Sequence, residues 1–265
     1  MRRLRRIAIY AGCAAVLWLV ALVVVGNAIE ARTREQISAR IADALQARAT
    51  IDDGELALVR GTFDLDNLAV RRDDAIGHLA VGVASIHCEL GPLGVALLDH
   101  HCRELALRGT RLEVSTAALF KLRRPKRPPL RAGKVVIDDA RFELLASAGA
   151  PSVGHLAVAI HHADAGETTF KTPLSWIFAL HTLHATIDLP SDLALRLDYE
   201  AGELRIAGGM FGATPIALPV TLPVADPADD PRAEMARLVE FGKDVAERLI
   251  ARKAKAWLMS KLASP

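Results

Sequence analysis

The sequence predicts a membrane-anchored, mainly β protein that ends in an amphipathic helix. Three observations lead to this prediction. Residues 7–29 form an apolar run that contains no charged side chain. Apolar residues then alternate with polar ones in about ten or more short segments, which is the period of a β-strand with one buried face. After Pro231 the spacing of the apolar residues becomes that of an α-helix.

The apolar run over residues 7–29 predicts a transmembrane helix. At about 1.5 Å per residue, a helix of this length crosses a hydrocarbon core about 30 Å thick. The alternative is a cleavable signal peptide with a site at Gly26-Asn27-Ala28, but the apolar region of a signal peptide has only about 7–15 residues. The cytoplasmic tail, residues 1–6, is rich in arginine. The positive-inside rule therefore puts the N-terminus in the cytoplasm and the bulk of the chain in the periplasm of a bacterium.

The residues after the anchor divide into a short helix and two β segments. Helical spacing predicts an amphipathic helix over residues 30–48. Residues 49–120 and 135–226 carry the alternating pattern, and their Gly, Pro and Asp turns predict an antiparallel sheet with one apolar face. Between them, residues 121–134 form a basic, proline-rich linker, which cannot be a central strand and is expected to split the strands into two groups.

The alternation changes phase twice near the start of the first β segment. The apolar positions switch from even to odd numbers across residues 60–62, and back to even numbers across Asp66 and Asn67. Because Gly and Asn tolerate the backbone angles of turns and bulges, both switches predict such a feature.

The last predicted element is an amphipathic helix over residues 231–263. Pro231 suits the first helical position, and an apolar stripe runs from Met235 to Leu262. We expect this stripe to pack on the sheet or to cap one end of it. The second half carries several Lys and Arg residues and no acid after Glu247, so the alternative is that it lies on an anionic bilayer.

Composition and motifs argue against catalysis and nucleic-acid binding. The net charge is only +2, and the basic residues are not interleaved with aromatics. The sequence lacks the common nucleophile, phosphate-binding and zinc-binding motifs, so neither an enzyme activity nor a cofactor is expected. His100-His101 and His161-His162 are adjacent pairs, which point to opposite faces of a strand and cannot share a metal. His181 and His184 offer two ligands only on a helix, so no metal site is predicted.

Two of the three cysteines can form a disulfide. Cys88 and Cys102 flank a turn-rich stretch, and an oxidising compartment would allow them to pair if they lie on neighbouring strands. Cys13 lies inside the predicted span and cannot join them. The sequence leaves open whether the bond forms.

Several motifs resemble those of AsmA-like proteins, a family of membrane-anchored envelope proteins. The motifs are Gly54-Glu55-Leu56-Ala57-Leu58, Asn67-Leu68-Ala69-Val70 and a strand–"GPL"–strand succession over residues 78–114; residues 202–223 resemble the later strands of the family. The resemblance, best over residues 1–145, implies an inner-membrane protein with a bent antiparallel sheet and an apolar inner face. Larger TamB-like and YhdP-like relatives are thought to carry phospholipid or to assist outer-membrane assembly. At about 3.3 Å per residue, the strands of this chain can build only a short groove.

Two functions remain open on this basis. In the first, the apolar face is a groove that binds or passes lipid acyl chains, probed best at Leu56, Leu58, Phe63, Leu65, Leu68, Val70, Leu105 and Leu107. In the second, the sheet has a closed, dry core and the chain is a structural or assembly factor of the envelope that binds no lipid.

Overall fold

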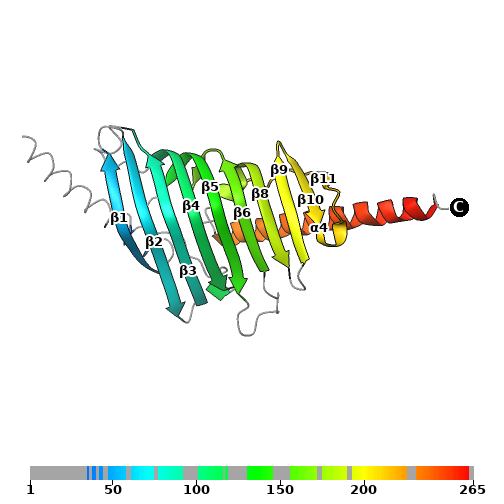
Figure 1. Cartoon of the computed structure of the whole chain (residues 1–265), viewed down its shortest axis with the longest axis horizontal. Helices are drawn as coiled ribbons and strands as arrows, with labels where there is room; N and C mark the ends of the chain where they lie inside the picture. Colours follow the sequence, from blue (N-terminus) through cyan, green and yellow to red (C-terminus); the bar gives the residue numbers. More distant parts are fainter. Residues whose placement is uncertain are drawn as a thin grey trace, which may run out of the picture.

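The computed structural model shows a mainly β protein built on one bent, open sheet with a long C-terminal helix (Figure 1). It describes residues 47–57, 61–74, 77–91, 101–115, 117–118, 130–145, 156–171, 175–189, 193–225 and 231–262, together with Glu35, Ser38, Ala39, Ala42 and Asp43, which are helical. The mainly β class and the C-terminal helix are therefore confirmed.

The described strands pair in the order β1-β2-β3-β4-β5-β6-β8-β9-β10-β11, and β7 pairs with one end of β5. The strands are β1 (Arg48–Ala57), β2 (Thr62–Asp74), β3 (Gly77–Glu89), β4 (His101–Ser115), β5 (Arg131–Leu145), β6 (Leu156–Ala165), β7 (Thr168–Thr169), β8 (Leu180–Leu189), β9 (Leu193–Glu200), β10 (Glu203–Gly208) and β11 (Ile216–Pro219). Two short 3₁₀ helices, η1 (Ser175–Ala179) and η2 (Gly209–Phe211), and the helix α4 (Pro231–Leu262) complete the described elements.

The prediction of a purely antiparallel sheet in two groups of strands is wrong at one place. β4 and β5 are neighbours and run parallel, with Leu105 opposite Val135. A tight hairpin cannot join parallel strands. After the first strand, the chain must return to the end of the sheet at which that strand began before the second strand can start. Residues 121–130 of the predicted linker fall within that return, whereas its last four residues, Arg131–Lys134, belong to β5. The basic segment therefore connects two adjacent strands of one sheet instead of separating two groups.

A line of irregular residues crosses five adjacent strands. In each of these strands one residue is left out of the cross-strand pairing. The buried apolar residues have odd numbers on one side of that residue and even numbers on the other, yet their side chains stay on one face of the sheet. These residues, the kink line, are Asn67 in β2, Ala84 in β3, Gly109 in β4, Asp139 in β5 and His161 in β6. Asn67, Gly109 and Asp139 have φ of 53°, 61° and 53°. The predicted change of phase at Asn67 is confirmed, but it arises from a left-handed residue and not from a bulge, because the β2–β3 register is the same on both sides of Asn67.

Helix α4 lies behind the sheet in Figure 1 and continues past the β11 edge. Its first part packs on the sheet, since Glu234 and Leu249 are 2% and 6% exposed. Farther along, Ile250 and Trp257 are 65% and 60% exposed. The predicted packing of the apolar stripe on the sheet therefore holds for the first part of the helix and ends before Ile250, because the helix is longer than the surface that it crosses.

The predicted anchor and tail, residues 1–29, lie outside the described residues, as does most of the predicted helix over residues 30–48. Within the residues that are described, no helix is both long and apolar enough to span a bilayer.

Candidate functional site: the apolar face of the sheet

The kink line divides the apolar face into two halves. The disulfide half lies on the side of Phe63, Cys88 and Leu105, which are cross-strand neighbours. The distal half lies on the other side, where Val70 pairs with Val81. Cross-strand partners place their side chains on the same face, so each half is a continuous apolar surface over several strands.

Most of the predicted groove residues are deeply buried. Phe63, Leu65, Leu68, Val70 and Leu105 are 3%, 2%, 5%, 0% and 5% exposed. Residues with so little exposed surface form the core, and a ligand reaches them only if the covering segments move.

The remaining predicted groove residues are less buried or less completely described. Leu107 is half-buried and packs against the core. Leu56 pairs with Phe63 in the β1–β2 ladder. Leu58 lies outside the described residues. The candidates whose side chains the structure describes thus share the apolar face, but none lies in its less buried part over β5 to β9.

The disulfide half is covered by the chain itself. Trp176 of η1 and Leu249 of α4 belong to the same buried cluster as Leu65, and Phe241 and Val245 of α4 pack against it. A polar contact accompanies this packing, because the Ser175 hydroxyl donates to Glu234 Oε2 at 3.4 Å. This half is a closed core.

On β5, β6, β8 and β9 the distal half is less buried away from the kink line. Its first row, next to the kink line, is buried, with Ala140, Ile160 and Ala185 at 2%, 5% and 1% exposure. Beyond this row the side chains are half-buried or, at Leu193, 38% exposed. These residues, the distal patch, are Phe142, Leu144, Leu156, Val158, Ile187, Leu189, Leu193 and Leu195.

Cross-strand pairing makes the distal patch one surface. Phe142 pairs with Val158, Val158 with Ile187, and Ile187 with Leu195. At about 4.8 Å per strand, the four strands that carry the patch extend it over about 14 Å. The alternating pattern predicted that these residues share a face, but it did not show that they are less covered than Leu65. A contiguous apolar surface of this kind is typical of a binding site.

Cys88 and Cys102 are joined by a disulfide, with a Cα–Cα distance of 5.5 Å. Both side chains are buried, at 6% and 1% exposure, in the disulfide half. The bond links β3 to the start of β4 and so fixes the ends of a connection that includes residues 92–100.

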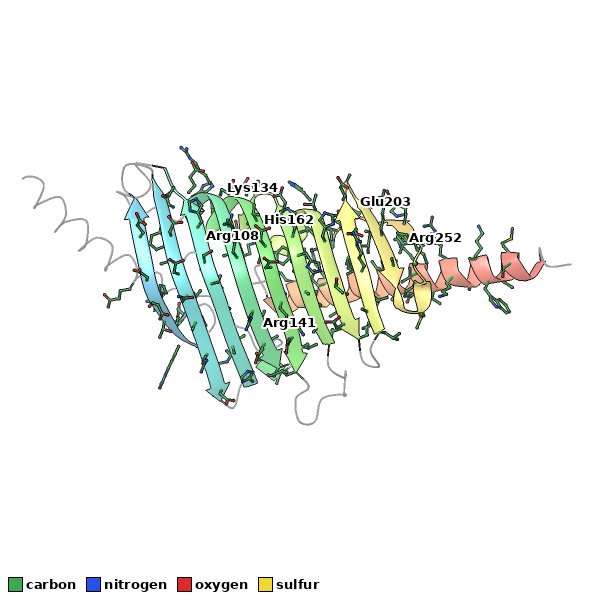
Figure 2. All side chains as sticks on the ribbon, viewed as in Figure 1. Arg108, Lys134, Arg141, His162, Glu203 and Arg252 are labelled. Atoms are coloured by element: carbon green, nitrogen blue, oxygen red, sulfur yellow. A yellow bond between two sulfur atoms is a disulfide. The ribbon has the colours of Figure 1, made fainter. Side chains whose placement is uncertain are left out.

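The opposite face of the sheet carries a row of charged and histidine side chains (Figure 2). Asp138 Oδ1 lies 2.7 Å from His162 Nδ1, and His184 Nδ1 lies 2.9 Å from Asp198 Oδ1. The two histidine rings stack with their centroids 6.5 Å apart. Figure 2 shows Arg108 and His162 in front of the sheet, while α4 passes behind it. The polar row and the apolar face therefore lie on opposite sides.

The carboxylate of Asp198 contacts two side chains of this row, His184 and Arg196. Its desolvation acts to raise its pKa, but hydrogen bonds from His184 and Arg196, together with their charges, outweigh this effect and hold the pKa of Asp198 below its usual value. Arg196 Nε lies 2.9 Å from Asp198 Oδ2. The carboxylate therefore serves to hold two strands together on the polar face.

The geometry of the adjacent histidines differs from the prediction. His161 Nε2 lies 3.1 Å from Thr186 Oγ1, so His161 is on the polar face together with His162. The reason is that His161 is the kink residue of β6, where strict alternation fails. Even so, the described part of the chain contains no group of three His, Cys, Asp or Glu side chains that could hold a metal ion.

Comparison with known proteins adds no relative to this description. No family model matches the chain, and a search of curated proteins found no match. The AsmA-like resemblance stays a prediction, and the function has to be argued from the apolar face itself.

Proposed function

We propose that this chain is an AsmA-like protein of the bacterial envelope that binds lipid acyl chains on the distal patch. In this proposal residues 7–29 anchor it in the inner membrane, and the sheet lies in the periplasm. The observation that carries the proposal is a contrast within one apolar face. The disulfide half and the β2–β4 part of the distal half are buried clusters, whereas the side chains of the distal patch on β5, β6, β8 and β9 are only half-buried.

The chemistry of the distal patch suits an acyl chain better than a polar ligand. Its eight side chains are aliphatic or aromatic, and they offer no hydrogen bond. A bound acyl chain would remove both its own surface and that of the patch from water, at about 25 cal/mol for each Å² of apolar surface buried. No catalytic step is part of this function.

The alternative is a structural or assembly factor without a lipid ligand. The sealed disulfide half favours it, because α4 and η1 already fill that part of the face. Under this alternative the distal patch is covered by protein.

Photocrosslinking separates the two functions. A photoreactive residue at Ile187 should form phospholipid adducts in cells. The matched control is Thr186, its neighbour in β8, which lies on the polar face and should form none. Adducts to protein alone at Ile187, or equal lipid adducts at both positions, would overturn the acyl-binding proposal and support the structural one. Lipid extraction of the purified full chain provides an independent count of bound phospholipid.

A further inference from the structure

We infer that the exposed half of α4, Ile250–Leu262, binds the surface of an anionic lipid bilayer. The inference rests on residues that the acyl-binding proposal does not use. Lys253 Nζ lies 5.0 Å from the centre of the Phe211 ring, which marks where α4 passes η2 near the β11 edge. Beyond that point all described side chains of the helix, up to Ser260, are exposed (Figure 2, near Arg252).

The exposed half has an apolar face of its own. Ile250, Ala254, Trp257 and Leu258 follow the spacing i, i+4, i+7, i+8, which puts them along one side of a helix. The Ile250, Trp257 and Leu258 side chains are 65%, 60% and 53% exposed. A Trp among aliphatic residues on such a face is typical of helices that lie at a membrane interface, where the indole ring contacts both apolar and polar layers.

The positive charge of the exposed half of α4 indicates which partner it binds. After Glu247 every charged residue of the helix is positive, and Arg252, Lys253 and Lys255 lie outside the apolar face. An anionic bilayer offers both an apolar layer for Trp257 and negative charge for the basic residues. A second copy of the helix would bring the same positive charges together, which opposes a homodimer through this surface.

Length determines how the helix meets the bilayer. From Ile250 to Leu262 the helix measures about 18 Å, which is too short to cross a hydrocarbon core about 30 Å thick. It therefore lies in the interface plane. Because α4 leaves the sheet at β11 and β1 forms the other edge, this contact is at the opposite end of the sheet from β1 (Figure 1).

The test places an environment-sensitive fluorophore at residue 258 of the full chain. The variant is Leu258→Cys in a Cys13→Ser background, with Cys88 and Cys102 held in their disulfide. The protein is reconstituted into vesicles of phosphatidylcholine alone or with about one third phosphatidylglycerol. We expect a blue-shifted emission and quenching by nitroxide-labelled lipid only in the vesicles that contain phosphatidylglycerol, and a reversal at high salt, which screens the charges. A fluorophore at residue 259, on the opposite side of the helix, is the matched control and should be quenched less.

Charge variants complete the test. Arg252→Gln combined with Lys255→Gln should weaken docking about 25-fold, since each basic residue near an anionic surface contributes about a fivefold gain. Equal emission in both kinds of vesicle, or no response to salt and charge removal, would overturn the inference. A blue shift that occurs in both kinds of vesicle and grows with the amount of protein per vesicle would show instead that this surface binds a second copy of the chain. Both substituted side chains are exposed, so circular dichroism should show an unchanged fold.

Discussion

Gly109 in β4 leaves no room for a side chain beside Ala84 in β3: a Cβ added to Gly109 would lie 2.8 Å from the Cβ of Ala84. Both residues belong to the kink line, and Gly109 has a φ of 61°. The close contact and the left-handed backbone occur together because the two strands change phase at the same level. A side chain larger than hydrogen at residue 109 is therefore expected to disturb the bend.

Replacing Gly109 by Ala should destabilise the sheet. A non-glycine residue in the left-handed region costs on the order of 1–3 kcal/mol, and the contact with Ala84 adds to this cost. Equilibrium unfolding in urea, followed by circular dichroism, measures the change. Gly82→Ala is the control, because a Cβ there meets nothing within 4 Å, and Ala is favoured over Gly in a strand. If both variants unfold at the same urea concentration, Gly109 does not have the strained geometry described.

Loss of the disulfide should also reduce stability. The bond between Cys88 and Cys102 closes a loop with a sequence separation of 14, and the chain-entropy model gives about 3 kcal/mol for a loop of this size. The double variant Cys88→Ser, Cys102→Ser should lower the free energy of unfolding by about this amount.

Thiol labelling checks whether the bond is present at all. In unreduced, denatured protein only Cys13 should react, and after reduction all three cysteines should react. Labelling of Cys88 and Cys102 before reduction would contradict the disulfide and remove the expected stability difference.

The sequence predicted local features of the fold better than long-range ones. The phase change at Asn67 was visible because alternation records which face a residue takes, and a one-residue slip reverses it. The parallel pairing of β4 with β5 was not visible, because Leu105 and Val135 alternate in the same way whichever direction their strands run. Strand direction depends on the path of the connection, which the alternating pattern does not record.

The same limit applies to the candidate site. Leu65 and Leu195 both look like inward-facing residues of amphipathic strands. Whether such a face is covered depends on segments far away in the sequence, here η1 and α4, whose Trp176 and Leu249 belong to the same buried cluster as Leu65, whereas Leu195 belongs to neither buried cluster. The sequence thus predicted an apolar face but not its open part, and it could not predict where along α4 the packing ends.

The ion pairs of Asp198 should give stability that depends on pH. Because the pKa of Asp198 is lower in the folded protein than in the unfolded chain, its contribution is complete above the unfolded pKa of about 3.9 and is lost as the pH falls through the folded value. Asp198→Asn should therefore be less stable than the parent protein at pH 7, by about 1 kcal/mol or less for a partly exposed pair. The two proteins should converge at low pH, and a difference that stays constant down to pH 2 would exclude this origin.

Matched leucine substitutions should distinguish the sealed half of the apolar face from the open one. Leu65 is 2% exposed and lies in the closed core, so Leu65→Ala should cost about 2–5 kcal/mol through lost burial and the cavity that it leaves. Leu195 is half-buried in the distal patch and belongs to neither buried cluster, so Leu195→Ala should cost clearly less. Urea unfolding of the full chain, after lipid has been extracted, measures both.

Lipid should act on these two positions differently. A ligand that binds only the folded protein raises its stability by mass action, so adding phospholipid should stabilise the parent chain, and should stabilise Leu195→Asp much less, because a charge in the patch opposes acyl-chain binding. Leu65→Ala, although less stable, should gain as much from lipid as the parent does. If Leu195→Ala costs as much as Leu65→Ala and lipid stabilises none of the proteins, the distal patch is covered by protein, and the structural alternative replaces the acyl-binding proposal.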